Sequence, residues 1–296
     1  MTDSTYPANG GFVDNTSAAT FIPEIWSDEV VAAYQSNLVL ANLVKKLSMT
    51  GKKGDTLHIP KPVRGDAHAK AEGTAVTVQN ANEGEVQIAL DKHFEYSRLI
   101  EDITDVQALS SLRRFYTEDA GYALADVVDS ALIAEANSGF TAKKSFVSGG
   151  IADESGATTT AFNDAGLRAA IAILDENNVP GDSRVLVVSP TIKADMLGVS
   201  NYVSTDFVTG KPVTNGHFGS LYGVDIVVST NLTGNSGEKN CLLMHKDALV
   251  FAEQVGVRTQ TQYKQEWLGD LMTADTLYGL ETYRPECGIT IAALSA

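Results

Sequence analysis

The stretch that decides the fold is Thr104–Asn137, TDVQALSSLRRFYTEDAGYALADVVDSALIAEAN. Apolar residues recur in it every three or four positions, the period of one face of an α-helix; they are Val106, Leu109, Leu112, Tyr116, Ala120, Leu124, Val127 and Ala131. At about 1.5 Å per residue the helix is about 50 Å long, whereas globular helices average about 11 residues. Asn137, Ser138 and Gly139 predict its end. We therefore predict a long helix that acts as a spine.

The segment before this helix predicts an extended hairpin. Three short stretches alternate as strands do, namely Thr56–Ile59, Val76–Val78 and Val86–Leu90. The chain between them is polar, contains prolines and glycines, and has too few large apolar side chains for a core of its own. A long two-stranded hairpin is marginally stable alone. We therefore expect this excursion to lie against a neighbouring molecule.

The N-terminal part of the chain predicts an arm followed by a helix. Residues 1–20 are rich in Thr, Ser, Ala, Asn and Gly, which is typical of a flexible arm, and they lack the basic start of a signal peptide. Pro23 opens a predicted amphipathic helix that ends near Lys45 and Lys46, with acidic residues at its start, as the helix dipole favours. Its apolar stripe consists of Trp26, Val30, Tyr34, Leu38 and Ala41.

Downstream of the spine helix the pattern is that of a compact α/β unit. Gly149–Thr160 is a predicted linker rich in Gly, Ser and Thr. Asn163 and Ser189 are predicted helix caps, the second followed by Pro190 at the first helical position. The other expected elements are strands over Val185–Val188, Val224–Val228, Cys241–Met244 and Val255–Thr261, a polar loop over Tyr202–Gly219, a short helix over Asp247–Ala252, and strand-like residues over Leu277–Ile291.

The composition is that of a folded, strongly acidic protein. Of the 296 residues, 44% are apolar and 20% charged, and the formal net charge is −15. Tight binding to nucleic acid needs clustered Lys and Arg, so it is disfavoured, while loose enclosure of nucleic acid stays open. No apolar run approaches the roughly 18 residues of a membrane span. The two cysteines, Cys241 and Cys287, are predicted to be buried free thiols.

No catalytic, cofactor-binding or metal-binding residue is predicted. Five histidines lack any familiar metal-ligand spacing, namely His58, His68, His93, His217 and His245. The pair Gly210–Lys211 lacks the hydroxyl residue of a phosphate-binding loop. We interpret Ser189 as a helix cap in preference to a nucleophile, and Asp126 and Asp129 as residues on the solvated side of the spine helix. Lys70 is expected to be exposed, or to contact another subunit.

Several stretches, in this order, resemble the major capsid proteins of tailed bacteriophages. They are Phe21–Trp26, Leu43–Lys46, Arg184–Pro190, Tyr222–Ser229 and Tyr283–Ile289. Each is weakly specific alone, but together they cover nearly the whole chain. The resemblance implies an α+β, Hong Kong 97-like capsid fold with an N-terminal arm, an extended E-loop hairpin, a long spine helix and an α/β axial domain.

The resemblance also implies a division of the chain. Residues 1–49 would be the N-terminal arm and entry helix, and residues 50–100 the E-loop. Residues 101–148 would be the peripheral domain with the spine helix. Residues 149–262 would form the axial domain, and residues 263–296 would return to the peripheral domain.

The implied function is that of a structural subunit and not an enzyme. The family assembles with itself, as hexamers and pentamers, into the icosahedral head of a tailed phage around double-stranded DNA. Such a subunit resides in the virion after assembly in the host cytoplasm, without membrane, metal or cofactor, and portal and decoration proteins are further candidate partners. Only about twenty polar residues precede the predicted entry helix, so we expect a separate scaffolding protein or a chain already trimmed, and Met1 favours the former.

Two other functions stay open at this point. An encapsulin-like compartment shares the fold but would package protein cargo instead of DNA. An α/β enzyme would use the unit around Val185–Ser229. The size of the particle in solution separates an enzyme from a shell protein.

Overall fold

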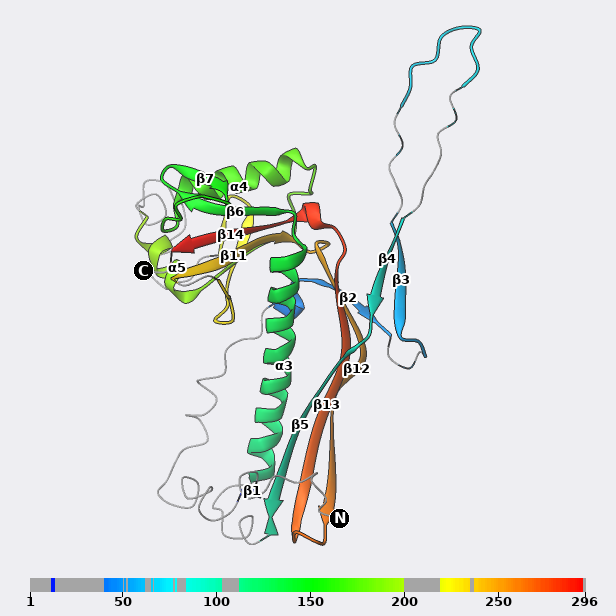
Figure 1. The fold of residues 1–296 in the computed structure, drawn as a ribbon, viewed down its shortest axis with the longest axis vertical. Helices are drawn as coiled ribbons and strands as arrows, with labels where there is room; N and C mark the ends of the chain where they lie inside the picture. Colours follow the sequence, from blue (N-terminus) through cyan, green and yellow to red (C-terminus); the bar gives the residue numbers. More distant parts are fainter. Residues whose placement is uncertain are drawn as a thin grey trace.

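The computed structural model describes residues 12–13, 40–49, 51, 53–61, 65, 67–76, 78, 84–102, 112–199, 219–234 and 237–294. These residues form an elongated molecule with a long sheet, an α/β lobe at one end of it, and a projecting hairpin (Figure 1). The elements are β1 (Phe12–Val13), η1 (Leu40–Asn42), β2 (Lys45–Ser48), β3 (Thr56–Lys61), β4 (Gly84–Ala89), β5 (Lys92–Glu101), α3 (Leu112–Gly139), β6 (Ala142–Val147), β7 (Gly150–Asp153), α4 (Asp164–Glu176), β8 (Arg184–Val188), α5 (Pro190–Leu197), β9 (Ser220–Leu221), β10 (Val224–Val228), β11 (Glu238–His245), β12 (Leu249–Lys264), β13 (Gly269–Thr282), η2 (Pro285–Cys287) and β14 (Gly288–Leu294).

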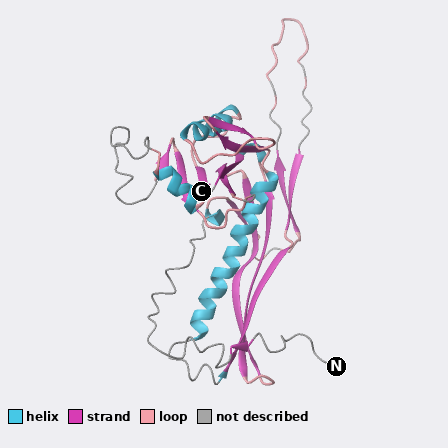
Figure 2. Ribbon diagram, turned by 60° about the vertical axis from the view of Figure 1, so that its left-hand side comes forward, coloured by secondary structure: helices cyan, strands magenta, loops and turns pink. Residues whose placement is uncertain are grey.

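The predicted spine helix is present as α3, which runs along one face of the long sheet (Figure 2). It packs against β5, β12 and β13. The sheet has the order β1-β5-β13-β12-β2, so its centre is the antiparallel pairing of β13 with both neighbours. Helix and sheet meet closely where α3 ends, because a side chain at Gly139 would overlap Thr282. The predicted part of this helix before Leu112 lies outside the described residues.

The α/β lobe contains a second sheet in the order β7-β6-β14-β11-β8-β10-β9. Both predicted helix caps are confirmed: the Asn163 side chain accepts a hydrogen bond from the Gly166 amide (2.7 Å), and Ser189 precedes Pro190 at the start of α5. β8 is buried along its whole length, as its apolar sequence predicts. The predicted linker is partly wrong, because Gly150–Asp153 forms β7 and pairs with β6.

The end of the chain contributes to both sheets. β13 lies in the long sheet. β14 instead lies between β6 and β11 in the lobe sheet, where six of its seven residues are buried. β5 and β12 also belong to the long sheet. The two sheets are therefore built from segments that lie far apart in the sequence.

The projecting hairpin consists of β3 and β4, paired from Thr56 with Ala89 to Lys61 with Gly84. Its root packs against the body of the molecule, which was not predicted from the sequence. The hairpin's Ile88 and Leu90 are buried in a cluster with Met49, Val250, Ala252 and Tyr283. Beyond the paired strands the predicted strand at Val76–Val78 is wrong for the single chain, since Val76 and Val78 have no regular structure and are exposed.

Two further predictions are wrong because distant partners determine the local structure. The N-terminal helix was predicted to end near Lys45 and Lys46, but these residues lie in β2, which pairs in parallel with Val250–Glu253. Of the rest of that helix, Leu40–Asn42 form the short 3-10 helix η1, while residues 23–39 and the polar loop up to residue 218 lie outside the described residues. Asp247–Ala252 was predicted to be helical, yet β12 begins at Leu249 and pairs with β13.

We predict that Gly279→Ala displaces the hairpin root. A Cβ at Gly279 would overlap the carbonyl oxygen of Ala89 and lie 3.0 Å from Ile88 Cγ2. Overpacking of this kind should lower the free energy of unfolding by about 1–3 kcal/mol in denaturant titration. The matched control is Gly121→Ala in α3, where the new Cβ meets nothing within 4 Å and helix propensity favours alanine. Equal stability of Gly279→Ala and the original chain would contradict the close packing.

Candidate functional site

Ser189 is a helix cap and not an exposed nucleophile. Its side chain is buried, its Oγ accepts a hydrogen bond from the Ile192 amide (3.3 Å), and it lies 2.8 Å from Thr191 Oγ1. A hydroxyl engaged in this way satisfies the orphan donors at a helix start. The interpretation made from the sequence is confirmed.

The two cysteines are free and buried, as predicted. Burial raises the pKa of Cys241 to about 12. Burial also raises the pKa of Cys287, with a smaller contribution from the neighbouring Glu286 carboxylate. Because the thiolate is the reactive form, both side chains are poor nucleophiles at neutral pH.

The histidines do not converge on one site. His58 contacts Glu85 and His93 contacts Asp275, each at 3.2 Å, and both imidazoles are exposed. His245 is buried, and its Nδ1 accepts a hydrogen bond from the Asp247 amide (3.2 Å). His68 is exposed on the projecting hairpin, and His217 lies outside the described residues. Within the described part of the chain, no three His, Cys, Asp or Glu residues are placed to hold a metal ion.

Asp126 and Asp129 were predicted to face solvent; that interpretation is wrong for Asp129, which is buried, whereas Asp126 is half-buried. Asp129 is only 1% exposed, and its Oδ1 accepts hydrogen bonds from the amides of Leu40 (3.1 Å) and Ala41 (3.2 Å). Asp126 Oδ1 accepts a hydrogen bond from Asn231 Nδ2 (2.6 Å). The spine helix therefore contacts two other parts of the chain through carboxylates. Asp129 holds the segment that leads into β2, and Asp126 contacts Asn231 in the lobe. In the sequence, both aspartates stand close to the apolar residues Leu124, Val128 and Leu132, and this proximity was the available sign that they lie near the core. These three residues are buried in the structure.

Asp129→Ala should destabilise the subunit. It leaves the amides of Leu40 and Ala41 without their acceptor in a buried place, which costs about 1–3 kcal/mol. Asp129→Asn retains an oxygen acceptor and should lose less. Asp182→Ala, at an exposed position, is the control. Denaturant titration of the three variants measures the order of their stabilities. Equal midpoints for Asp129→Ala and Asp182→Ala would refute the role of Asp129.

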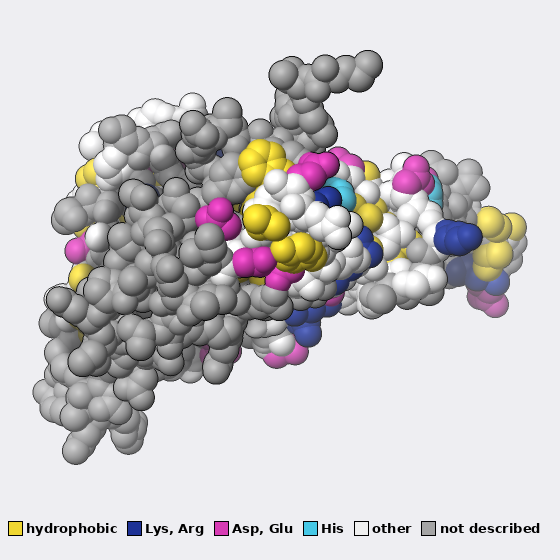
Figure 3. Space-filling model, turned by 90° about the horizontal axis from the view of Figure 1, so that it is seen from below, with side chains coloured by type: hydrophobic (Ala, Val, Ile, Leu, Met, Phe, Trp, Pro, Cys, Tyr) yellow, Lys and Arg dark blue, Asp and Glu magenta, His cyan; other side chains and the backbone are white. Residues whose placement is uncertain are grey.

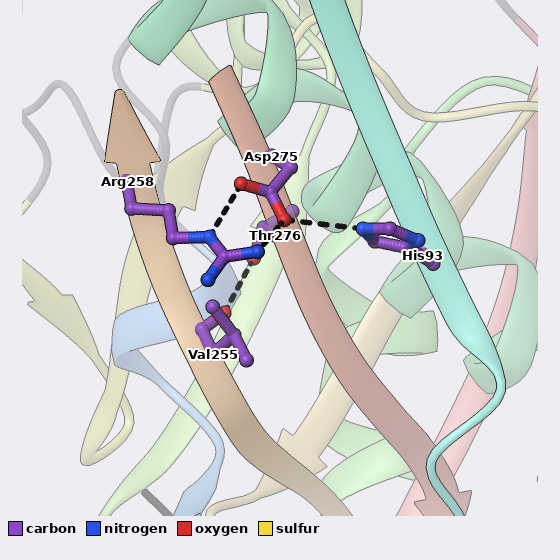
Figure 4. Close-up of polar contacts among 5 residues, drawn as sticks. All are labelled: His93, Val255, Arg258, Asp275 and Thr276. Carbon is purple, nitrogen blue, oxygen red and sulfur yellow. Dashed lines mark hydrogen bonds and ion pairs between the residues drawn. The ribbon is translucent and has the colours of Figure 1, made fainter. Parts of the chain in front are cut away.

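A charged cluster links the three central strands of the long sheet (Figure 4). Arg258 on β12 donates two hydrogen bonds to Asp275 on β13, from Nε to Oδ1 (2.7 Å) and from Nη2 to Oδ2 (2.8 Å). His93 on β5 approaches Asp275 Oδ2 from the other side (3.2 Å). The register of β12 shifts in the same place, between Glu253 and Arg258, and the buried Thr276 hydroxyl donates to the Val255 carbonyl (3.1 Å). The cluster thus joins the strands where the regular ladder is interrupted.

This cluster predicts a pH dependence. The hydrogen bonds from Arg258, and to a smaller extent the one from His93, lower the pKa of Asp275 below its ordinary value of 3.8. A carboxylate whose pKa is lower in the folded state stabilises the fold above about pH 4, and this stabilisation is lost as the pH falls through the lowered pKa. The thermal midpoint of unfolding should therefore fall less steeply between pH 6 and pH 2.5 in Asp275→Asn than in the original chain. Asp182→Asn is the control. An equally steep fall of the thermal midpoint in Asp275→Asn and Asp182→Asn would count against a stabilising role of the cluster.

Large apolar side chains are exposed at the two ends of the molecule. At the turn between β12 and β13, Tyr263, Trp267 and Leu268 are exposed, and on the projecting hairpin Val76 and Val78 are 68% and 86% exposed. Figure 3 shows hydrophobic side chains beside acidic ones on the end of the long sheet. Exposed apolar groups at such extremities indicate contacts with other molecules. Among the described residues no helix is long and apolar enough to cross a membrane.

Comparison with known proteins gives consistent results. A family model described as phage capsid protein matches residues 19–283. The structure of Mycobacterium phage Che8 is 26% identical, with a TM-score of 0.74, over 92% of this chain and 97% of that one. The capsid structure of cyanophage P-SCSP1u is 20% identical, with a TM-score of 0.72, over 99% and 100% of the two chains. The mature capsid of bacteriophage PhiM1 is 16% identical, with a TM-score of 0.69, over 92% and 91%. No curated protein matches.

Proposed function

Because the chain belongs to the phage capsid protein family, as a major capsid subunit with the Hong Kong 97-like fold, we propose that hexamers and pentamers of it form the head of a tailed phage. One observation of the structure carries this proposal. The hairpin beyond Lys61 and Gly84 projects away from the rest of the chain and is exposed at every described residue from 67 to 76 and at 78 (Figure 1). A segment that buries so little within its own subunit is expected to order against a neighbour.

The division into domains is part of the proposal. Residues 1–49 form the arm and entry segment, 50–100 the E-loop, 101–148 the peripheral domain with α3, 149–262 the axial domain, and 263–296 the return. The strand order supports a division by sheet, since β5 and β12 lie in the long sheet with β13, and β14 lies in the lobe sheet. We assign the long sheet to the proposed peripheral domain and the lobe sheet to the proposed axial domain. The lobe that α4 and α5 flank would surround the pentamer and hexamer axes.

Double-stranded DNA is the proposed content of the shell. The formal net charge of −15 favours enclosure without adhesion, because a protein that grips phosphates needs clustered basic residues. A separate scaffolding protein, a portal and decoration proteins are proposed partners, and assembly is proposed to take place in the host cytoplasm before the subunit becomes part of the virion. The proposed role is purely structural, since Ser189 and both cysteines are engaged or buried.

Electron microscopy of the expressed chain tests the proposal, with and without a co-expressed scaffolding protein. We expect hexamers, pentamers or closed shells, and uniform shells only when the scaffolding protein is present. Shells that enclose protein cargo instead of DNA in infected cells would favour the encapsulin-like alternative. A chain that stays a monomer or small oligomer under every condition would contradict the proposal, and uniform shells from this chain alone would contradict the separate scaffolding protein.

A further inference from the structure

The lobe meets the spine helix and the long sheet at one compact joint. The chain passes through this joint in three short segments, residues 140–141, 246–248 and 283–287. The segments pack together, because the Ala248 carbonyl accepts hydrogen bonds from the amides of Tyr283 (2.9 Å) and Arg284 (3.2 Å). A side chain at Gly288 would overlap the Phe140 ring. Short, adjacent segments of this kind are where two packed units tilt relative to each other.

The lobe also contacts the spine helix away from this joint. The connection between β10 and β11, yellow in Figure 1, hangs from the lobe beside α3. Its Asn231 Nδ2 donates a hydrogen bond to Asp126 Oδ1 on α3 (2.6 Å). At 1.5 Å per residue, Asp126 lies about 20 Å along the helix axis from Gly139, where α3 ends at the joint. The contact therefore lies at the end of a lever of that length.

Closer to the joint, the same connection is held by several contacts. Leu232 is buried in one apolar cluster with Leu132 of α3. Asn137 on α3 donates a hydrogen bond from Nδ2 to Thr233 Oγ1 (3.2 Å) and accepts one at Oδ1 from Asn240 Nδ2 (3.3 Å). The connection is thus anchored near the joint, and the bond from Asn231 is the one of these contacts that lies furthest from it.

A tilt at the joint acts first on the pair Asp126 and Asn231. Rotation by about 10° at the end of a lever of about 20 Å moves the contact by about 3.5 Å, whereas the length of a hydrogen bond varies by only about 0.5 Å. Both side chains are half-buried, so water replaces the bond when it opens, and no buried polar group is left without a partner. The pair therefore resists a tilt while it is closed and opens at little cost.

We propose that Asp126 and Asn231 form a releasable clasp that sets the angle between the lobe and the spine helix. With the clasp closed the lobe is held at one angle, and with the clasp open it tilts about the joint. The inference rests on the proposed function, because a subunit that surrounds both five-fold and six-fold axes meets its neighbours at two angles. The clasp would then influence the curvature of the shell.

An exchange of the two side chains tests the clasp in free subunits at about pH 8, where carboxylates are charged. Asn231→Asp places a second carboxylate beside Asp126, and like charges repel. Asp126→Asn combined with Asn231→Asp restores one amide and one carboxylate in exchanged positions. Spin labels on Asp182→Cys in the lobe and Ser97→Cys in the long sheet report the angle as a distance. Both of these positions are exposed, whereas the native cysteines are buried and stay unlabelled.

We expect Asn231→Asp to shift or broaden the distribution of distances between the labels, and the exchanged pair to restore the original distribution. Asp126→Asn alone retains an oxygen acceptor and is the control that should change nothing. An unchanged distribution in Asn231→Asp, or an equal change in the exchanged pair or in Asp126→Asn, would overturn the inference. Where Asn231→Asp does not fold, Asn231→Ala removes the donor without adding charge, and the same expectation and the same refutation apply to it.

Shells assembled with the scaffolding protein test the link to curvature. Asn231→Asp should give shells of more than one size, whereas the original chain and the exchanged pair should each give one size. Shells of one size from Asn231→Asp would overturn the influence on curvature and leave the proposed function standing. Absence of shells from the original chain would contradict the proposed function, and the clasp itself is then decided by the distances in free subunits.

Discussion

The pairing of β13 with β5 on one side and β12 on the other is the interaction on which the rest of the molecule depends. It forms the surface on which α3 lies. The pairing of β13 with β5 ends at Tyr278, next to Gly279, where the hairpin root packs. Asp129 then ties the chain entering β2 to the same helix. Sheet, spine helix and hairpin root therefore form one packed unit, and the lobe sheet continues from it through β6, β11 and β14.

The sequence predicted those elements whose signal is local. The period of α3, the caps at Asn163 and Ser189, and the apolar runs of β8, β10 and β11 are properties of neighbouring residues. The helix at Asp247–Ala252 was wrong because pairing with β13, over 30 residues away for Leu249 and Thr282, outweighs a weak local preference. Asp129 was misplaced because its partners lie 88 and 89 residues earlier in the chain.

The functional surfaces were predictable only in outline. The poor core of the excursion indicated a need for a neighbour, but the buried root with Ile88 and Leu90 was not foreseen. The parallel pairing of β2 with Val250–Glu253 of β12 could not be read from the sequence, because the two strands lie far apart in the chain.

The central claim is that one packed unit folds within the subunit while the outer hairpin becomes ordered against a neighbour. Trypsin cleavage after Lys70, an exposed residue of the outer hairpin, measures this most directly when free subunits and shells are compared over time. The account predicts rapid cleavage at Lys70 in free subunits, with the long sheet intact, and strong protection in shells. Resistance of Lys70 in the free subunit, or equal cleavage in both states, would contradict it.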